Sequence, residues 1–323
     1  MKYAFIAGAL CQSGDRFLRA GYKAETLSLE TVLDEMGKRH EAGGVEIHYR
    51  GADLDLGGLK DRLFQTGLLP AAVNTWTYGD RKWRYGSLSA ADDRIRRAAV
   101  EHCKACIDAA RFLGAGCVGL WLGQDGHDYV FQIDYRAQWV ALRQSLRELC
   151  DYAPDLCLAL EPKAREPRNH SLVDCVQTVL LLRMEVEREN LGVALDAGHV
   201  ICAGGAIGPA IELAMRYGCL YDVHMNDNLG TWDDDMIVGS VRLNEMLEAL
   251  YLLRRYDYRG YLTVDIFPYR EDPFDAVCES IRALRTYESI IERLGMETID
   301  ALVARANVPD TLAALRRAAF HTR

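Results

Sequence analysis

Eight short runs of β-forming residues recur along the chain, and each is followed by a stretch with helical periodicity. The helical stretches place apolar residues at i, i+3, i+4 and i+7, as SLETVLDEMGKRHEAG (28–43) does. The β-forming runs are apolar at most positions, which is typical of parallel strands covered on both faces. They are residues 3–8, 44–48, 70–76, 117–123, 156–163, 191–199, 220–227 and 261–268.

Eight strand–helix repeats predict an α/β protein built as a closed (β/α)8 barrel, the TIM barrel. The 323 residues exceed the roughly 250 that such a barrel needs. We therefore expect residues 1–290 to form the barrel and residues 291–323 to form a C-terminal helical extension. The rival fold, an open doubly wound sheet, would carry a glycine-rich phosphate loop after its first strand, and GALCQSGDR (8–16) does not match that pattern.

Charge and cysteine content limit the class of partner. The formal net charge is −9, and an acidic protein repels nucleic acids and anionic membranes, so we expect a small neutral substrate and bound cations. Ten cysteines lie mostly in apolar runs. Only Cys103 and Cys106 form a CxxC pair, which we interpret as buried helix residues rather than a zinc or redox site. Many unpaired thiols, with no 18-residue apolar stretch, predict a soluble cytoplasmic protein.

Polar side chains stand at the ends of the last four strands. Glu161 follows the fifth run, Asp196 the sixth, His224 lies in the seventh and Asp265 in the eighth. Each alone would pass as an ordinary polar strand cap. Neighbouring parallel strands lie about 4.8 Å apart, so the four side chains can converge on one point, where burying them without a counterion would be costly. Three carboxylates and one imidazole suit Mn²⁺, Co²⁺ or Mg²⁺, with Zn²⁺ as a further option. These four residues are the first ligand group.

A second set of metal-binding residue types lies close to the first in the sequence. His199 follows Asp196 by three residues, and Asp233 and Asp235 follow His224 after a short loop. On an extended backbone Asp233 and Asp235 point the same way. An isolated acidic triplet is usually a solvated loop, but this one lies between Trp232 and an apolar run. We predict that Asp196, His199, Asp233 and Asp235, the second ligand group, hold a second cation, with Asp196 bridging the two.

Three further candidates stand at strand ends in the first half of the chain. They are His48, Trp76 and Trp121. The pattern alone is equally compatible with a purely structural role, in which His48 is a hydrogen-bonded core residue and the two tryptophans pack in the core. It also fits a wall that excludes water from the substrate, which would strengthen electrostatic interactions inside the site.

Several segments resemble xylose isomerases, in the same order along the chain. The resemblance covers roughly residues 40–285, and its most specific parts are EPK followed by EPR, and the spacing of the two acids in DDD. The segments are GVEIH (44–48), NTW (74–76), WLGQDG (121–126), EPKAREPR (161–168), DAGHVICAGG (196–205), HMNDNLGTWDDDMIVG (224–239) and VDIF (264–267).

The resemblance implies a role for each candidate. The two ligand groups would hold two divalent cations, with Asp235 serving the second, catalytic one. His48 would assist ring opening, Lys163 would hold the substrate's O1, and Trp76 with Trp121 would shield C1 and C2.

The chain departs from xylose isomerases at several positions. Asp196 replaces a usual Glu and His224 a usual Asp, an arrangement similar to that of rhamnose isomerases. Gly51 replaces an acid that orients the ring-opening histidine. The C-terminal arm is short, although we still expect a homo-oligomer, a dimer or a tetramer.

The function that the sequence favours is a metal-dependent aldose–ketose isomerase, which moves hydride between C1 and C2 of an open-chain neutral sugar. The nearest alternative is a ketose 3-epimerase on the same barrel, with Glu161 and Asp265 as acid and base. A metal-dependent phosphodiesterase of the endonuclease IV type would want more than the eight histidines present, and a basic rim. A barrel without catalytic activity is the remaining alternative.

Overall fold

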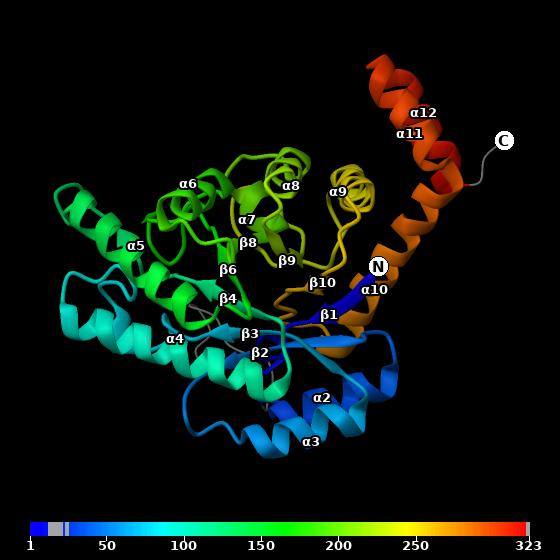
Figure 1. Ribbon diagram of the computed structural model, residues 1–323. Helices are drawn as coiled ribbons and strands as arrows, with labels where there is room; N and C mark the ends of the chain where they lie inside the picture. Colours follow the sequence, from blue (N-terminus) through cyan, green and yellow to red (C-terminus); the bar gives the residue numbers. More distant parts are fainter. Residues whose placement is uncertain (12–21, 23–25, 321–323) are drawn as a thin grey trace.

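A ring of eight parallel strands forms the centre of the molecule (Figure 1). The computed structural model describes residues 1–11, 22 and 26–320. The strands follow the order β1-β10-β9-β8-β6-β4-β3-β2, and a parallel bridge between Ile6 and Glu46 joins the two ends of the sheet. The barrel is therefore nearly closed, as predicted. Its strands are β1 (Lys2–Phe5), β2 (Gly44–Tyr49), β3 (Leu69–Thr75), β4 (Cys117–Trp121), β6 (Cys157–Glu161), β8 (Leu191–Asp196), β9 (Leu220–Met225) and β10 (Tyr261–Val264).

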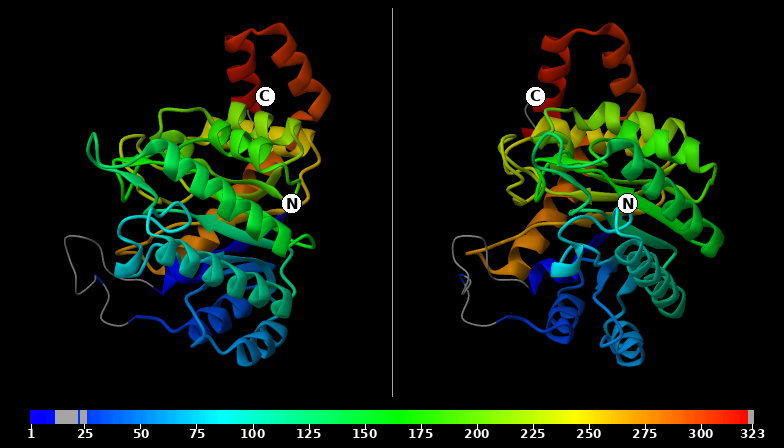
Figure 2. Two further views of the ribbon diagram at one scale, coloured as in Figure 1. Left: turned by 60° about the vertical axis from the view of Figure 1, so that its left-hand side comes forward. Right: turned by 90° about the vertical axis from the view of Figure 1, so that its left-hand side faces the viewer.

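Helices surround the barrel on its outer side (Figures 1 and 2). Many begin at an aspartate or serine whose side chain accepts from a first-turn amide, such as Ser28, Asp55, Asp92 and Asp134. The outer helices are α2 (Leu29–Arg39), α3 (Leu56–Thr66), α4 (Asp93–Leu113), α5 (Tyr135–Tyr152), α6 (Val176–Val186), α8 (Ile207–Arg216), α9 (Leu243–Arg255) and α10 (Pro273–Leu294). Shorter elements at the strand ends are α1 (Ala7–Leu10), the 3-10 turn Arg81–Trp83, the small strands β5 (Gly126–His127) and β7 (His170–Ser171), and α7 (Ala197–Cys202).

The strands are buried on both faces, which explains their nearly continuous apolar sequences. Inside the barrel, Ala72, Cys117, Ala159 and Ala194 pack against one another. Side chains two residues further along a strand point to the same face. The layer of small side chains inside the barrel is therefore followed by a polar layer. Glu161, two residues after Ala159, and Asp196, two residues after Ala194, belong to this polar layer.

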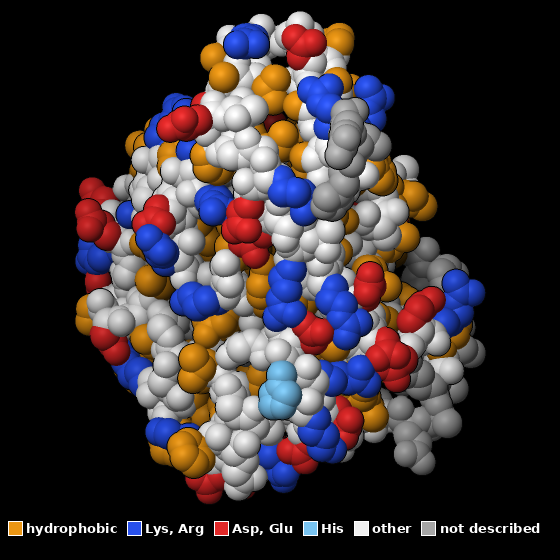
Figure 3. Space-filling model, turned by 90° about the vertical axis from the view of Figure 1, so that its right-hand side faces the viewer, with side chains coloured by type: hydrophobic (Ala, Val, Ile, Leu, Met, Phe, Trp, Pro, Cys, Tyr) orange, Lys and Arg blue, Asp and Glu red, His pale blue; other side chains and the backbone are white. Residues whose placement is uncertain are grey.

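The C-terminal part of the chain extends away from the barrel (Figures 1 and 2). Helix α10 continues to Leu294, and α11 (Met296–Arg305) and α12 (Val308–Phe320) follow as a helical hairpin. On the face of the molecule that carries these helices, acidic and basic side chains are intermixed (Figure 3). Ion pairs such as Arg254–Glu292 and Arg285–Glu41 contribute to this mixture.

The positions of Cys103 and Cys106 confirm that they are buried helix residues. All ten cysteines are free thiols, and Cys103 and Cys106 are buried on α4. Among the described residues, no helix combines the length and apolar character that crossing a bilayer requires. Residues 12–21 and 23–25, which include part of the segment GALCQSGDR, lie outside the described part of the chain.

Candidate active site

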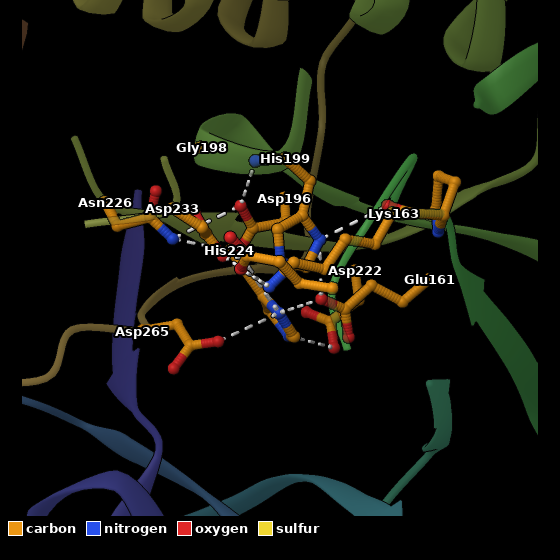
Figure 4. A network of polar contacts seen from close by, with 12 residues as sticks. Glu161, Lys163, Asp196, Gly198, His199, Asp222, His224, Asn226, Asp233 and Asp265 are labelled. Atoms are coloured by element: carbon orange, nitrogen blue, oxygen red, sulfur yellow. Dashed lines mark hydrogen bonds and ion pairs between the residues drawn. The ribbon is translucent and has the colours of Figure 1, made fainter. Parts of the chain in front are cut away.

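The first ligand group lies at the carboxyl ends of four adjacent strands. Glu161 ends β6, Asp196 ends β8, His224 lies in β9 and Asp265 follows β10. The parallel register pairs Asp196 with His224, and His224 with Thr263, two residues before Asp265. Their ligand atoms all lie within 4.8 Å of one another, and Figure 4 shows them pointing toward a common centre. The structure thus brings together the four side chains that the sequence placed on consecutive strands.

The His224 imidazole is the centre of this cluster. Its Nδ1 atom lies 3.7 Å from Glu161 Oε1, 3.9 Å from Asp196 Oδ2 and 3.8 Å from Asp265 Oδ2. That nitrogen is buried and has no hydrogen-bond partner. Burial acts to lower the pKa of His224, but the surrounding carboxylates, Glu46 and Glu161 foremost, raise it well above its ordinary value.

Three carboxylates around an unpaired imidazole nitrogen form a site for a cation. Carboxylate oxygens and a neutral imidazole are donors that a divalent cation such as Mn²⁺, Co²⁺ or Mg²⁺ accepts. A bound cation would offset the repulsion among these acids, which are largely removed from water. The residues of the first ligand group therefore fit a divalent metal.

Three residues of the second ligand group also come together. Ligand atoms of Asp196, His199 and Asp233 lie within 4.8 Å of one another. Asp196 accepts a hydrogen bond from the His199 amide at 2.9 Å and begins α7, which turns the His199 ring back toward the strand ends. His199 Nε2 then lies 3.1 Å from Asp233 Oδ2. Burial acts to lower the pKa of His199, but Asp196 and Asp233 raise it to about 9.

An ammonium group also occupies this region. Lys163 Nζ donates to Asp233 Oδ2 at 2.7 Å and lies 3.3 Å from Glu166 Oε2. Burial acts to lower the pKa of Lys163, but Asp233 and Asp235 raise it well above its ordinary value. The lysine is therefore a fixed positive charge beside the ligand groups.

The backbone at Asp235 differs from the expected extended conformation. We predicted that Asp233 and Asp235 would point the same way from an extended backbone. Asp235 has a φ of 47°, in the left-handed region, so the backbone is not extended at this residue. Asp235 lines the same pocket but is not part of the compact group formed by Asp196, His199 and Asp233. Burial and the neighbouring Asp233 raise the pKa of Asp235 well above its ordinary value.

An aromatic wall closes one side of the pocket. The ring centres of Trp76 and Tyr78 are 4.5 Å apart, and those of Tyr78 and Trp121 are 4.4 Å apart. The His48 ring contacts Trp76 edge-on, with 5.2 Å between the two ring centres. Burial lowers the pKa of His48 to about 4, so the imidazole is neutral at pH 7. The cavity has a volume of about 330 Å³, and Phe267 and Tyr269 also line it.

Several residues that contact the site were not predicted from the sequence. Glu46 and Asp222 lie beneath His224, and Asn226 donates to both oxygens of Asp196 at 3.2 and 2.9 Å. Tyr78 belongs to the aromatic wall. A signal for Glu46 did exist: an acidic residue in the middle of an apolar strand, two positions before His48, faces the barrel interior.

The family profile described as "Xylose isomerase-like TIM barrel" matches residues 35–287, and the chain belongs to this family. A curated relative, a xylose isomerase of Dinoroseobacter shibae, is 24% identical over 229 residues, which is 69% of this chain and 48% of the relative. The chain thus spans about half the length of that protein.

Solved structures with the same fold include a D-tagatose 3-epimerase-like protein, at 18% identity and a TM-score of 0.72, covering 91% of this chain and 99% of that one. An L-ribulose 3-epimerase matches at 18% identity and a TM-score of 0.71, covering 91% of this chain and 98% of that one. At such low identity the likeness concerns the fold.

Proposed function

We propose that the chain is a metal-dependent sugar epimerase that inverts C3 of a neutral ketose. Its first ligand group would hold one divalent cation, and Glu161 and Asp265 would act as the acid–base pair. The family, the gathered metal-binding residues, and the fold shared with an L-ribulose 3-epimerase and a D-tagatose 3-epimerase-like protein support this choice over the aldose–ketose isomerase that the sequence favoured.

The observation that carries the proposal is the position of the two outer carboxylates. In the strand order β10-β9-β8-β6, Asp265 and Glu161 stand at the two ends, with His224 and Asp196 between them. They therefore approach the centre of the cluster from opposite sides. A ketose bound there would present one face of C3 to Glu161 and the other to Asp265, as inversion by proton transfer requires.

The chemistry follows from this placement. A bound divalent cation supplies Lewis acidity, which draws electron density from the ketose C2 carbonyl and makes the C3 proton more acidic. One carboxylate removes that proton, the electron pair moves into a C2–C3 double bond, and negative charge collects on O2. The other carboxylate, in its acid form, returns a proton to the opposite face of C3. Lys163 contributes a fixed positive charge near the developing negative charge.

The pocket favours a neutral sugar over a phosphorylated one. Of the described residues that line it, Lys163 is the single lysine or arginine, and its ammonium is committed to Asp233 and Glu166. No lysine or arginine among these described lining residues is thus free to balance a phosphate, and the imidazoles of His199 and His224 already face carboxylates. This lining also disfavours a phosphodiesterase. Trp76, Tyr78 and Trp121 offer aromatic surfaces to the apolar C–H face of a sugar, and they exclude water from the reacting atoms.

An aldose–ketose isomerase is the second candidate, and a specific observation favours it. Asp196, His199 and Asp233 form a compact second group beside Lys163, as a two-cation isomerase would require, and the curated relative is a xylose isomerase. In that case hydride would pass directly between C1 and C2, and His48 would assist ring opening.

Turnover in deuterated water separates the two candidates. The purified protein, loaded with Mn²⁺, is incubated with a panel of neutral ketoses and aldoses, and products are analysed by NMR. Proton abstraction places solvent deuterium on C3 of the product, and Glu161→Gln should abolish this exchange. Product formed by C1–C2 transfer without solvent deuterium at C3 would overturn the epimerase proposal in favour of the isomerase.

A further inference from the structure

The two ring nitrogens of His224 face different carboxylates, and neither has a hydrogen-bond partner. The Nδ1 atom faces the carboxylates of the first ligand group, whereas Nε2 lies 3.3 Å from Glu46 Oε2. Glu46 belongs to β2, which β1 and β10 separate from β9 in the barrel order. The Glu46 side chain is fully buried and reaches across the barrel interior.

A second side chain fixes the position of the Glu46 carboxylate. Asn74 on β3 donates from Nδ2 to Glu46 Oε2 at 2.9 Å, inside the barrel. Room for Asn74 depends on Gly119 of the next strand, β4, because a Cβ atom there would lie 2.1 Å from Asn74 Oδ1. Asn74 and Glu46 therefore form a chain of polar side chains that ends at Nε2 of His224.

We propose that Glu46 is a positioning residue for the metal site. This role rests on the proposed function. Glu46 accepts the Nε2–H of His224, so that the lone pair of Nδ1 would be free to bind a cation held by the first ligand group. Metal-binding histidines generally donate their other ring N–H in this way, and the partner fixes both the tautomer and the ring orientation. A charged acceptor also makes the imidazole a stronger electron donor than a neutral one would.

Asp222 is the competing partner and supplies the matched control. Its Oδ2 atom lies 3.5 Å from His224 Nε2, and it is also buried. No side chain holds that oxygen, because Asp222 Oδ2 has no hydrogen-bond partner, whereas Oδ1 accepts from the Val223 amide. The shorter distance and the support from Asn74 favour Glu46 as the acceptor.

Metal affinity tests the proposal without any substrate. Mn²⁺ binding to the full chain is measured by calorimetry for the wild type, Glu46→Gln, Glu46→Met and Asp222→Asn. We expect Glu46→Gln to weaken Mn²⁺ binding by about 10- to 100-fold, and Glu46→Met to weaken it further. Asp222→Asn should change it by less than threefold. Equal losses in Glu46→Gln and Asp222→Asn, or unchanged affinity in Glu46→Gln, would overturn the proposal.

A spectroscopic signature separates positioning from general loss of structure. In the Co²⁺-loaded wild type, the ring N–H of a coordinated histidine gives a paramagnetically shifted proton resonance that persists while a hydrogen bond protects it from exchange. This resonance should persist in Asp222→Asn, shift in Glu46→Gln and disappear in Glu46→Met. Its persistence in a folded Glu46→Met protein would contradict the assignment. Wild-type protein that binds neither Mn²⁺ nor Co²⁺ would instead remove the metal centre of the proposed function, and this inference with it.

Discussion

Lys163 Nζ and Asp233 Oδ2 form a buried ion pair at 2.7 Å, between residues 70 positions apart in the chain. The exposed fractions of the two side chains are 13% and 2%. The pair places a fixed positive charge next to the cluster of carboxylates, and Asp233 also contacts His199. It therefore links the substrate pocket to the second ligand group.

Removing the ammonium should damage both stability and catalysis. Lys163→Met leaves Asp233 buried without its closest cation, so we expect the free energy of unfolding to fall by about 3 kcal/mol. The rate constant kcat/KM should fall by roughly 100-fold, because charge developing on the substrate loses a fixed partner. Urea unfolding and steady-state kinetics measure the two effects.

Lys38→Met is the matched control for this variant. Lys38 pairs with Glu35 on the exposed surface of α2, where water and salt screen an ion pair so that it contributes little to stability. A Lys163→Met protein as stable and active as Lys38→Met would show that the buried ion pair contributes neither to stability nor to catalysis.

Stability of the metal-free protein should fall as pH rises. Burial raises the pKa of Asp265 to about 7 and that of Asp222 to about 6, and Asp196 with Asp233 raises that of His199 to about 9. A pKa raised by folding means that the folded state binds more protons, so its stabilising effect is lost as pH passes the folded value.

We expect the Tm of chelated protein to drop by on the order of 5–10 °C between pH 5 and pH 9. Saturating Mn²⁺ should flatten this dependence, because the cation replaces the protons. Scanning calorimetry at several pH values checks both statements, and a chelated protein that is more stable at pH 9 than at pH 5 would contradict them.

The number of bound cations distinguishes the two ligand groups. If one cation binds at the first ligand group, Asp265→Asn should weaken Mn²⁺ binding by at least about 100-fold, since it removes a charged ligand. Asp235→Asn should still bind close to one equivalent. Elemental analysis of the dialysed proteins gives the stoichiometry. Two equivalents of Mn²⁺ in the wild type and one in Asp235→Asn would instead favour the two-cation isomerase.

Gly119 should tolerate no side chain. Gly119→Ala would place a Cβ atom 2.1 Å from Asn74 Oδ1, which forces Asn74 away from Glu46 and should cost about 1–3 kcal/mol of stability. Mn²⁺ affinity should decrease with it. Gly116→Ala is the control, because nothing lies within 4 Å of its added Cβ atom. Equal unfolding midpoints for the two variants would show that Asn74 is not held where the structure places it.

Much of the fold was predictable from the sequence, because its signals are local. The alternation of apolar runs and helical periodicity predicted all eight barrel strands, with differences only at their ends. Asp196 and His199 illustrate such a difference, since the predicted strand 191–199 ends at Asp196, whose side chain begins a helix. The order of the strands also predicted that Glu161, Asp196, His224 and Asp265 would meet, because parallel neighbours end at the same rim.

Other features depend on contacts that no local pattern encodes. Glu46 meets His224 only because the barrel closes and brings β2 across from β9, and Lys163 meets Asp233 only because two loops fold over the same rim. The backbone at Asp235 likewise departs from the extended conformation that its spacing suggested. Sequence periodicity specifies which face of an element a side chain occupies. The partner across the barrel is decided by strand order, register and loop path together, and these exist only once the chain has folded.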